Sequence, residues 1–397
     1  MKRSILLKGG VGTVVAVLAL AGCSSSKPAA DSSTSSSSSS STADTSASSA
    51  MTSDSAMSGS GMSSAMSGSE MSSSAMSGSE MSGSSMSGSE MSGSAMSGAN
   101  GGAPTKASKN YKVTFIQGVA GDNFYITMQC GIQDEAKKLG VTVNTQGPAK
   151  FDPTLQKPIL DSVVASKPDA ILIAPTNVTA MQAPLAKAAA SGIKIVLVDT
   201  TVNDPSFAVS EVSSDNVGGG KAAFDAVKQL QPKGGKVLVI STDPGVSTVD
   251  ARVKGFDEAA KGDSTFTDLG VQYSHNVPAT AAQIVTAALQ KDPDIVGIFA
   301  TNLFSAEGVA TGIKQAGKVG KVSIVGFDAG PDQVKALKDG TVQALVAQQP
   351  GIIGVDGLQQ AVAGLDGGTV TKKIQTGFTV LTKDNVDSSG AAYKASC

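Results

Sequence analysis

The chain has 397 residues, in which 31 basic residues nearly balance 33 acidic ones. Without a basic excess the chain cannot follow a phosphate backbone, so nucleic acid is excluded as a partner. One histidine and three cysteines, with no Cys-x-x-Cys, are too few for a zinc centre or a Ser-His-Asp site. We therefore expect no enzyme, no metal site and no cofactor.

The N-terminal segment reads as an export signal. Three basic residues precede the apolar run 11–20, and Leu-Ala-Gly follows directly before Cys23. This layout is typical of a signal peptide, and the run is short for a permanent membrane span. Its end resembles the lipobox of bacterial lipoproteins, which predicts a signal peptide at 1–22 and a membrane anchor through diacylated Cys23. The alternative is an ordinary secretory signal with an incidental cysteine.

The segment 23–108 consists mostly of Ser, Gly and Met, with a methionine every five residues from Met66 to Met96. Such a composition buries too little apolar surface to offset the entropy of ordering, so we expect a disordered tether. About 85 residues of this kind span roughly 50 Å. Methionine thioethers are soft ligands, so binding of Cu(I) is an alternative role for the repeat.

From position 109 onward, short β-branched runs alternate with helical patterns. Strands are expected at 113–117, 141–145, 170–174, 194–198, 236–240, 266–273, 295–300 and 322–327. Expected helices include 124–139, 155–166, 217–230, 251–261 and 279–290. Strict alternation predicts a parallel sheet covered on both faces, and two such series predict two doubly wound α/β lobes. Ligands of such folds bind at the carboxyl ends of the strands, here between the lobes.

Eight short motifs follow one another in this part of the chain. They are Asp122–Tyr125, Pro168–Thr176, Gly192–Asp199, Ser214–Asn216, Ala251–Phe256, Ile298–Asn302, Val325–Asp328 and Ala347–Pro350. Together they resemble the type I periplasmic sugar-binding proteins, the ribose-binding group. The resemblance implies a three-stranded hinge between lobe 1, at 109–214 plus 348–376, and lobe 2, at 215–347 plus 377–397.

The same resemblance implies a function. It predicts the solute-binding lipoprotein of an ABC importer, a monomer that captures a sugar-like solute by hinge closure and presents it to a membrane permease. The LacI-type transcriptional regulators share this core and are one alternative, although a leader and tether stand where their DNA-binding helices would be. A receptor for a small hydroxylated signal molecule is another.

The candidate ligand-binding residues lie within these motifs or at the ends of strands. They are Asp122, Asn123, Phe124, Tyr125, Asp199, Thr200, Arg252, Asn276, Asn302, Asp328 and Gln348. Aromatic faces suit a sugar ring, and charged or amide groups suit its hydroxyls, at about 1.5–3 kcal/mol for each hydrogen bond to a charged group. For the acidic and amide residues the alternative is a helix cap or turn. For the aromatic pair it is core packing.

Arg252 is one of only two arginines, and the other lies in the signal peptide. Its planar fork binds two oxygens at once, which lysine cannot do. The alternative is a structural pair with Asp250 or Asp257. His275 lies where the family often has an aromatic that stacks on the ring, and a structural role is its alternative.

Some positions depart from the family pattern. Thr200 and Thr201 follow Asp199 where ribose binders have an arginine, and Asn123 replaces a proline. These changes favour another pentose, a hexose, a polyol or a similar hydroxylated molecule over ribose. The run 218–222, Gly-Gly-Gly-Lys-Ala, is similar to a phosphate loop but lacks its Ser or Thr.

Cys130, in the first expected helix, and Cys397, at the end of the sequence, are the cysteines that lipidation leaves. An oxidising compartment favours a disulfide between them, which would pin an otherwise fraying end. The alternative is a buried Cys130 and a free terminal thiol.

Overall fold

The computed structural model describes residues 103–397, all of which fall within one compact unit. The expected signal peptide, Cys23 and the methionine repeat lie outside the described residues. Within residues 103–397, no helix is both long and apolar enough to cross a membrane.

The first sheet has six parallel strands in the order β11-β5-β4-β3-β1-β2. They are β1 (Lys112–Ile116), β2 (Thr142–Gln146), β3 (Ala170–Ile173), β4 (Lys194–Val198), β5 (Ser210–Ser214) and β11 (Lys373–Thr376). β3 and β4 are almost entirely apolar and buried, as expected for strands of a parallel sheet that is covered on both faces.

The second sheet also has six strands, in the order β12-β10-β9-β8-β6-β7. They are β6 (Gly235–Ser241), β7 (Phe266–Tyr273), β8 (Ile295–Ala300), β9 (Ser323–Phe327), β10 (Ala344–Gln348) and β12 (Phe378–Leu381). Only β12 is antiparallel, against β10. The parallel register pairs Val346 with Phe327, the last residue of β9, so that β10 continues two residues farther, to Gln348.

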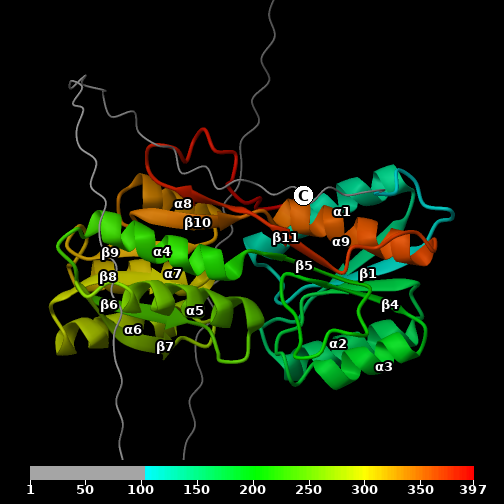
Figure 1. Cartoon of the computed structure of the whole chain (residues 1–397), viewed down its shortest axis with the longest axis horizontal. Coiled ribbons are helices and arrows are strands. Elements are labelled where there is room, and N and C mark those ends of the chain that lie inside the picture. Colours follow the sequence, from blue (N-terminus) through cyan, green and yellow to red (C-terminus); the bar gives the residue numbers. More distant parts are fainter. Residues whose placement is uncertain (1–102) are drawn as a thin grey trace, which may run out of the picture. The chain divides into compact units, whose positions relative to one another are not determined.

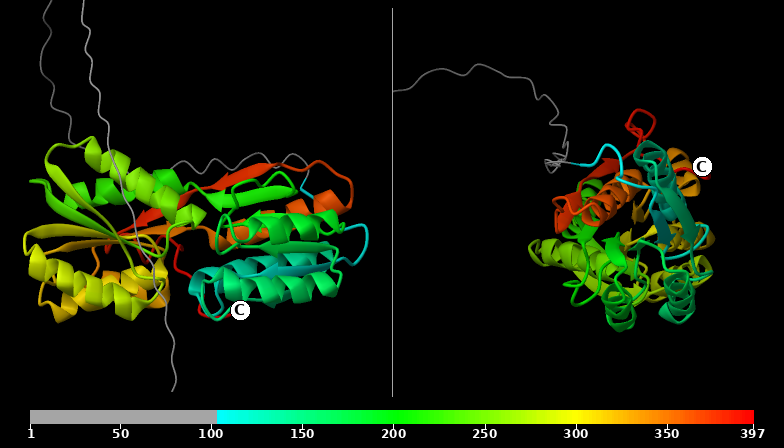
Figure 2. Two further views of the ribbon diagram at one scale, coloured as in Figure 1. Left: turned by 90° about the horizontal axis from the view of Figure 1, so that it is seen from below. Right: turned by 90° about the vertical axis from the view of Figure 1, so that its right-hand side faces the viewer.

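Helices cover both faces of each sheet (Figures 1 and 2). In the first lobe, α1 (Asn123–Leu139) and α9 (Pro350–Leu365) pack together on one face, and α2 (Pro153–Ala165) and α3 (Gln182–Ala190) cover the other. In the second lobe, α4 (Asn216–Leu230) and α5 (Ser247–Lys261) share one face. The opposite face carries α6 (Pro278–Lys291), α7 (Leu303–Gln315) and α8 (Pro331–Lys338). The predicted pair of doubly wound lobes is thus confirmed.

The eight expected strands are present, and none of their ends is shifted by more than one residue. The pattern missed four more, β5, β10, β11 and β12. β5 reads Ser-Glu-Val-Ser-Ser, with alternating burial and a single large apolar side chain. β11 and β12 are only four residues long and lie at sheet edges. Their pairing depends on partners far away in the sequence, which a local pattern does not contain.

The chain passes between the two sheets after Ser214, after Gln348 and after Thr376. Gln348, expected in lobe 1, is the last residue of β10 in the second sheet. The three crossings lie together, because the Ser214 hydroxyl donates to Gln348 Oε1 at 2.8 Å and lies 3.4 Å from the Thr376 hydroxyl. Polar contacts therefore join all three hinge segments beside the cleft.

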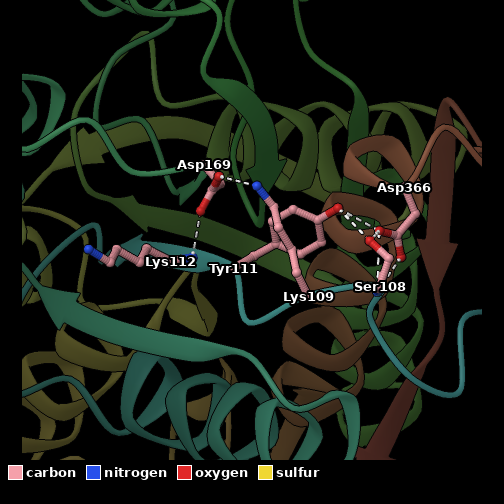
Figure 3. A network of polar contacts seen from close by, with 6 residues as sticks. All are labelled: Ser108, Lys109, Tyr111, Lys112, Asp169 and Asp366. Atoms are coloured by element: carbon pink, nitrogen blue, oxygen red, sulfur yellow. Dashed lines mark hydrogen bonds and ion pairs between the residues drawn. The ribbon is translucent and has the colours of Figure 1, made fainter.

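The start of the folded part is fixed to the first lobe (Figure 3). The carboxylate of Asp366, which ends α9, accepts from the Ser108 backbone N–H at 3.2 Å and from the Tyr111 hydroxyl at 2.6 Å. The Ser108 hydroxyl also donates to this carboxylate. Its hydrogen bond is the largest of the effects that hold the pKa of Asp366 below its usual value, followed by that of Tyr111. Contacts of the folded part already begin at Ala107, inside the expected tether, where the backbone N–H donates to Leu139 O at 2.9 Å.

Candidate functional site

Arg252 lies on α5 at the inner edge of the second lobe and is 2% exposed. Its Nε donates to Asn216 Oδ1 at 2.9 Å, and Nη1 donates to the carbonyl of Thr301 at 2.8 Å. The guanidinium lies over the ring of Phe327, with its carbon 3.8 Å from the ring centroid. These contacts fix the plane of the fork, and they replace the pair with Asp250 or Asp257 that was the alternative.

Two glycines let α4 and α5 approach closely enough to place this arginine. A Cβ on Gly220 would lie 2.0 Å from the carbonyl oxygen of Arg252, and one on Gly255 would lie 2.0 Å from that of Val217. Gly220, the last residue of the glycine run at the start of α4, therefore serves helix packing. The similarity of the run to a phosphate loop has a structural explanation.

Two carboxylates of the first lobe lie at the same cleft. Asp122 caps α1 and accepts from the Phe124 backbone N–H at 2.8 Å. Asp199 follows β4 and accepts from the Tyr125 hydroxyl at 2.7 Å. The backbone of Asp199 has φ +64°, a left-handed conformation that costs free energy in a residue with a side chain and turns it off the strand axis.

Asp328 occupies the corresponding place in the second lobe, after β9, with φ +78°. Gln348 Nε2 donates to its Oδ1 at 2.7 Å, and the Leu303 backbone N–H donates to Oδ2 at 3.0 Å. Asn302 caps α7 through Ser305 and also donates to Asn276 Oδ1 at 2.7 Å. Capping and site roles thus coexist, whereas the sequence presented them as alternatives.

Burial dominates the electrostatics of the three carboxyl groups. It raises the pKa of Asp122 to about 8, with the negative charge of Asp328 adding to the effect. Burial also raises the pKa of Asp199 to about 6, although Arg252 and the Tyr125 hydroxyl act in the opposite direction. The pKa of Asp328 is likewise raised by burial, against opposing effects led by Arg252. The site is therefore rich in acceptors that an incoming donor would stabilise in their ionised form.

These groups surround one cavity between the lobes, with about 420 Å³ of space not filled by atoms, part of it open to solvent. Nine of the eleven predicted residues line it: Asp122, Phe124, Tyr125, Asp199, Arg252, Asn276, Asn302, Asp328 and Gln348. The wall combines carboxylates, amides, one guanidinium and three aromatic rings. It can bind hydroxyl groups at its polar side and a ring face at its aromatic side.

Asn123 and Thr200 do not line this cavity, contrary to the prediction. Asn123 is the first residue of α1, and its amide donates to the carbonyl of Lys394 at 3.2 Å. The hydroxyl of Thr200 donates to the carbonyl of Pro175 at 2.7 Å, which draws the side chain into the first lobe. His275 is also outside the cavity wall, since its ring is exposed and bonds Asp243.

Five further residues line the cavity that the sequence did not single out. They are Phe151, Thr242, Val246, Thr248 and Val249. Thr248 and Val249 lie four and three positions before Arg252 on α5, so helical periodicity could have placed them on the same face. Phe151 follows the carboxyl end of β2. An aromatic residue at that position was the feature of the sequence that could have indicated a place in the cavity wall.

The two lobes contact each other around the cavity. The Val178 backbone N–H donates to the carbonyl of Gly245 at 3.0 Å, and the Thr201 backbone N–H donates to the Ser247 hydroxyl at 2.9 Å. In each pair one residue belongs to the first lobe and the other to the second. The structure is therefore a closed arrangement of the two lobes.

The cysteines Cys130 and Cys397 form a disulfide, with Cα atoms 5.3 Å apart. It attaches the end of the chain to α1 of the first lobe, so the segment expected in lobe 2 ends against lobe 1. The C-terminus lies beside α1 in Figure 1.

Comparisons with known proteins agree with this geometry. Residues 113–369 match the family described as periplasmic binding protein domain. The chain is 32% identical over 247 residues to the D-allose-binding periplasmic protein of Escherichia coli, covering 60% of this chain and 79% of the relative. It is 30% identical over 260 residues to the ribose import binding protein of Bacillus subtilis, covering 66% of this chain and 83% of the relative.

Solved structures give the same result. An ABC transporter solute-binding protein from Agrobacterium vitis, bound with α-D-tagatopyranose, shares 39% identity with a TM-score of 0.71, over 72% of this chain and all of that one. A carbohydrate transporter protein from Agrobacterium radiobacter, in complex with D-arabinose, shares 30% identity with a TM-score of 0.67, over 70% of this chain and 96% of that one. Because the family match spans every residue of the cavity wall, the chain belongs to the periplasmic binding proteins, a family of transporter solute-binding proteins.

Proposed function

We propose that this protein is the solute-binding component of an ABC importer and that it captures one monosaccharide or polyol between its lobes. The observation that supports this most directly is the cavity wall, where Arg252 and three buried carboxylates lie beside aromatic rings. Sugar hydroxyls both donate and accept, so they can bond carboxylates and a guanidinium at once. A relative with 39% identity binds a ketohexose in its solved structure.

Binding proceeds by hinge closure. In an open form the solute reaches the residues of one lobe, and closure then brings the other lobe onto it. Closure removes the solute from water, which strengthens each hydrogen bond to Arg252 and Asp199. No group in this scheme transfers to or from the solute, so the protein binds without changing it. A permease in the membrane then recognises the closed form.

The N-terminal segment completes the proposal. Diacylation of Cys23 after removal of residues 1–22 would hold the protein at a membrane outside the cytoplasm. A tether over 23–108 would let a monomeric receptor move near that surface and still reach its transporter. Each of these features rests on the sequence pattern.

A panel of sugars tests the function. We expect isothermal titration calorimetry to find micromolar or tighter binding for one of D-tagatose, D-allose, D-arabinose, D-fucose and ribitol. Arg252→Ala should abolish that binding, because each hydrogen bond from the guanidinium contributes about 1.5–3 kcal/mol.

The matched control is Lys254→Ala, which removes a positive charge from the exposed face of the same helix, where Lys254 pairs with Glu258. It should leave the affinity unchanged. Equal affinity of Arg252→Ala and the parent chain would overturn the assigned site.

A further inference from the structure

The C-terminal segment 382–397 leaves one lobe and ends on the other. At its start it belongs to the second lobe, where the Asn385 amide donates to the carbonyl of Val380 at 3.0 Å and Asp387 pairs with Lys338. At its end Cys397 is bonded to Cys130 of α1, in the first lobe. The segment is thus a fourth connection between lobes that the hinge already joins three times.

The change of lobe takes place between two neighbouring residues. The Tyr393 backbone N–H donates to the carbonyl of Ala329 in the second lobe at 2.9 Å. The next N–H, that of Lys394, donates to the Thr127 hydroxyl on α1 at 2.7 Å, and the carbonyl of Lys394 accepts from Asn123 at 3.2 Å. Asn123, which does not line the cavity, therefore has a role in holding this segment.

Tyr393 contacts three residues of the cavity wall without lining the cavity itself. It is 5% exposed, and its hydroxyl donates to Asp328 Oδ1 at 3.0 Å while accepting from the Gln348 backbone N–H at 2.9 Å. Its ring meets the edge of Phe124, with centroids 6.0 Å apart. Asp328, Gln348 and Phe124 all line the cavity, although Tyr393 does not.

We infer that the segment 382–397 is a disulfide-closed strap that favours the closed arrangement of the lobes and, through Tyr393, positions Asp328 for the solute. The inference rests on the proposed function, since it assigns the strap a part in that same site. Cys397 lies four positions after Tyr393, and such a stretch reaches at most about 14 Å when fully extended. While the disulfide holds, the lobes cannot separate widely unless Tyr393 leaves Asp328.

Without the disulfide the last residues would have only exposed hydrogen bonds to α1, and chain ends held in this way fray. Fraying would release Tyr393 and leave Asp328 Oδ1 with one donor in place of two. The open arrangement would then be more populated, and a solute that binds the closed form would bind more weakly.

Hydrogen exchange of the full-length chain without added sugar tests the strap by itself. In Cys130→Ser/Cys397→Ser we expect the amides of Tyr393, Lys394 and Gln348 to exchange at least tenfold faster than in the parent chain. Reduction of the parent chain by dithiothreitol should have the same effect, since the dithiol supplies the two electrons and two protons that convert the disulfide to two thiols. The same reductant should not change the double variant, in which Cys23 is the remaining cysteine. Unchanged exchange in the double variant would overturn the strap.

Sugar affinity tests the positioning role. Tyr393→Phe keeps the ring and removes the hydroxyl, so we expect about tenfold weaker binding. We also expect the affinity to increase with pH, as in the parent chain, but to do so at higher pH values. Arg252, Gln348 and the Tyr393 hydroxyl all lower the pKa of Asp328, so loss of the hydroxyl raises that pKa and moves the rise of affinity to higher pH. The other carboxyl groups at the cavity are those of the buried Asp122 and Asp199, which Tyr393→Phe leaves in place.

The matched control is Tyr111→Phe, which removes another hydroxyl bonded to a carboxylate, that of Asp366, away from the cavity. It should change neither the affinity nor its pH profile. If Tyr393→Phe binds like Tyr111→Phe, the positioning role is refuted, and the proposed function stands as long as Arg252→Ala does not bind. If no sugar in the panel binds the parent chain, the exchange experiment still decides the strap.

Discussion

At the scale of single residues, the main feature of the site is a set of buried carboxyl groups, two of which accept a hydrogen bond from a neighbouring side chain. Tyr125 donates to Asp199, and Gln348 donates to Asp328, before any solute arrives. These bonds hold each carboxylate in one orientation, so little rotational freedom remains to be lost on binding. Asp122 has a backbone donor alone, which is consistent with its pKa being raised to about 8.

This arrangement predicts how affinity depends on pH. In the free protein burial raises the pKa of Asp199 to about 6 and that of Asp122 to about 8. Hydroxyl donors from a bound sugar would favour the ionised carboxylates and lower both values, so binding releases protons. Affinity should therefore rise from pH 5 to pH 9, by several-fold in calorimetric titrations.

The variant Asp122→Asn distinguishes the contribution of Asp122 from that of Asp199, because it removes the titration of Asp122. Its asparagine can still cap α1, so the helix should be retained. We expect this variant to retain the rise between pH 5 and pH 7 and to lose the part above pH 7. An affinity that is flat or falls over this whole interval in the parent chain would contradict the prediction.

At the scale of elements, the closeness of α4 and α5 decides where the arginine lies. Gly220 and Gly255 form the contact at which each helix meets the backbone of the other. Helices normally pack with axes 8–10 Å apart, at a distance set by the side chains between them. Any side chain at this point would push α5, and Arg252 with it, away from Asn216 and Thr301.

Gly220→Ala tests this contact. Its Cβ would lie 2.0 Å from the carbonyl oxygen of Arg252, a backbone atom that can move only with the helix. Overpacking of this kind costs about 1–3 kcal/mol, so we expect a lower Tm by several degrees and weaker sugar binding.

Gly262→Ala serves as the control, because the added Cβ on this residue at the end of α5 would meet its nearest atom at 3.4 Å. Its Tm should stay close to that of the parent chain. Equal melting temperatures of the two variants would refute the packing argument.

At the scale of the whole molecule, closure uses direct hydrogen bonds between the lobes in addition to the strap. The Thr201 N–H to the Ser247 hydroxyl, at 2.9 Å, and the Val178 N–H to the Gly245 carbonyl, at 3.0 Å, lie at the margin of the cavity. Since each of these bonds contributes only about 1 kcal/mol, a modest free energy from the solute can shift the population toward the closed form.

Ser247→Ala removes one of these bonds. A hydrogen bond contributes a net of about 1 kcal/mol, so the affinity should fall about fivefold, mainly through faster dissociation in stopped-flow measurements. Ser166→Ala removes a hydroxyl that bonds only within the first lobe, to Val163, and should leave the dissociation rate unchanged. A dissociation rate of Ser247→Ala equal to that of the parent chain would contradict a role in closure.

The sequence by itself determined the fold class and most of the cavity wall. The apolar runs that form β3 and β4 can be recognised from neighbouring residues alone. Acidic or amide residues that follow such runs, such as Asp199 and Asn302, lie at the carboxyl edge of a parallel sheet whatever the details of packing. Arg252 could be identified because the sequence contains only two arginines, and such rarity is a property of the sequence alone.

Only the tertiary structure decided the remainder. It turned Thr200 and Asn123 away from the cavity, brought Phe151 to it, and placed Tyr393 behind Asp328, which is 65 positions away in the chain. The physical reason is that such contacts depend on the direction of a side chain and on elements distant in sequence. Local hydrophobic patterns determine where helices and strands form, but a hydrogen bond between lobes exists only once both lobes are folded.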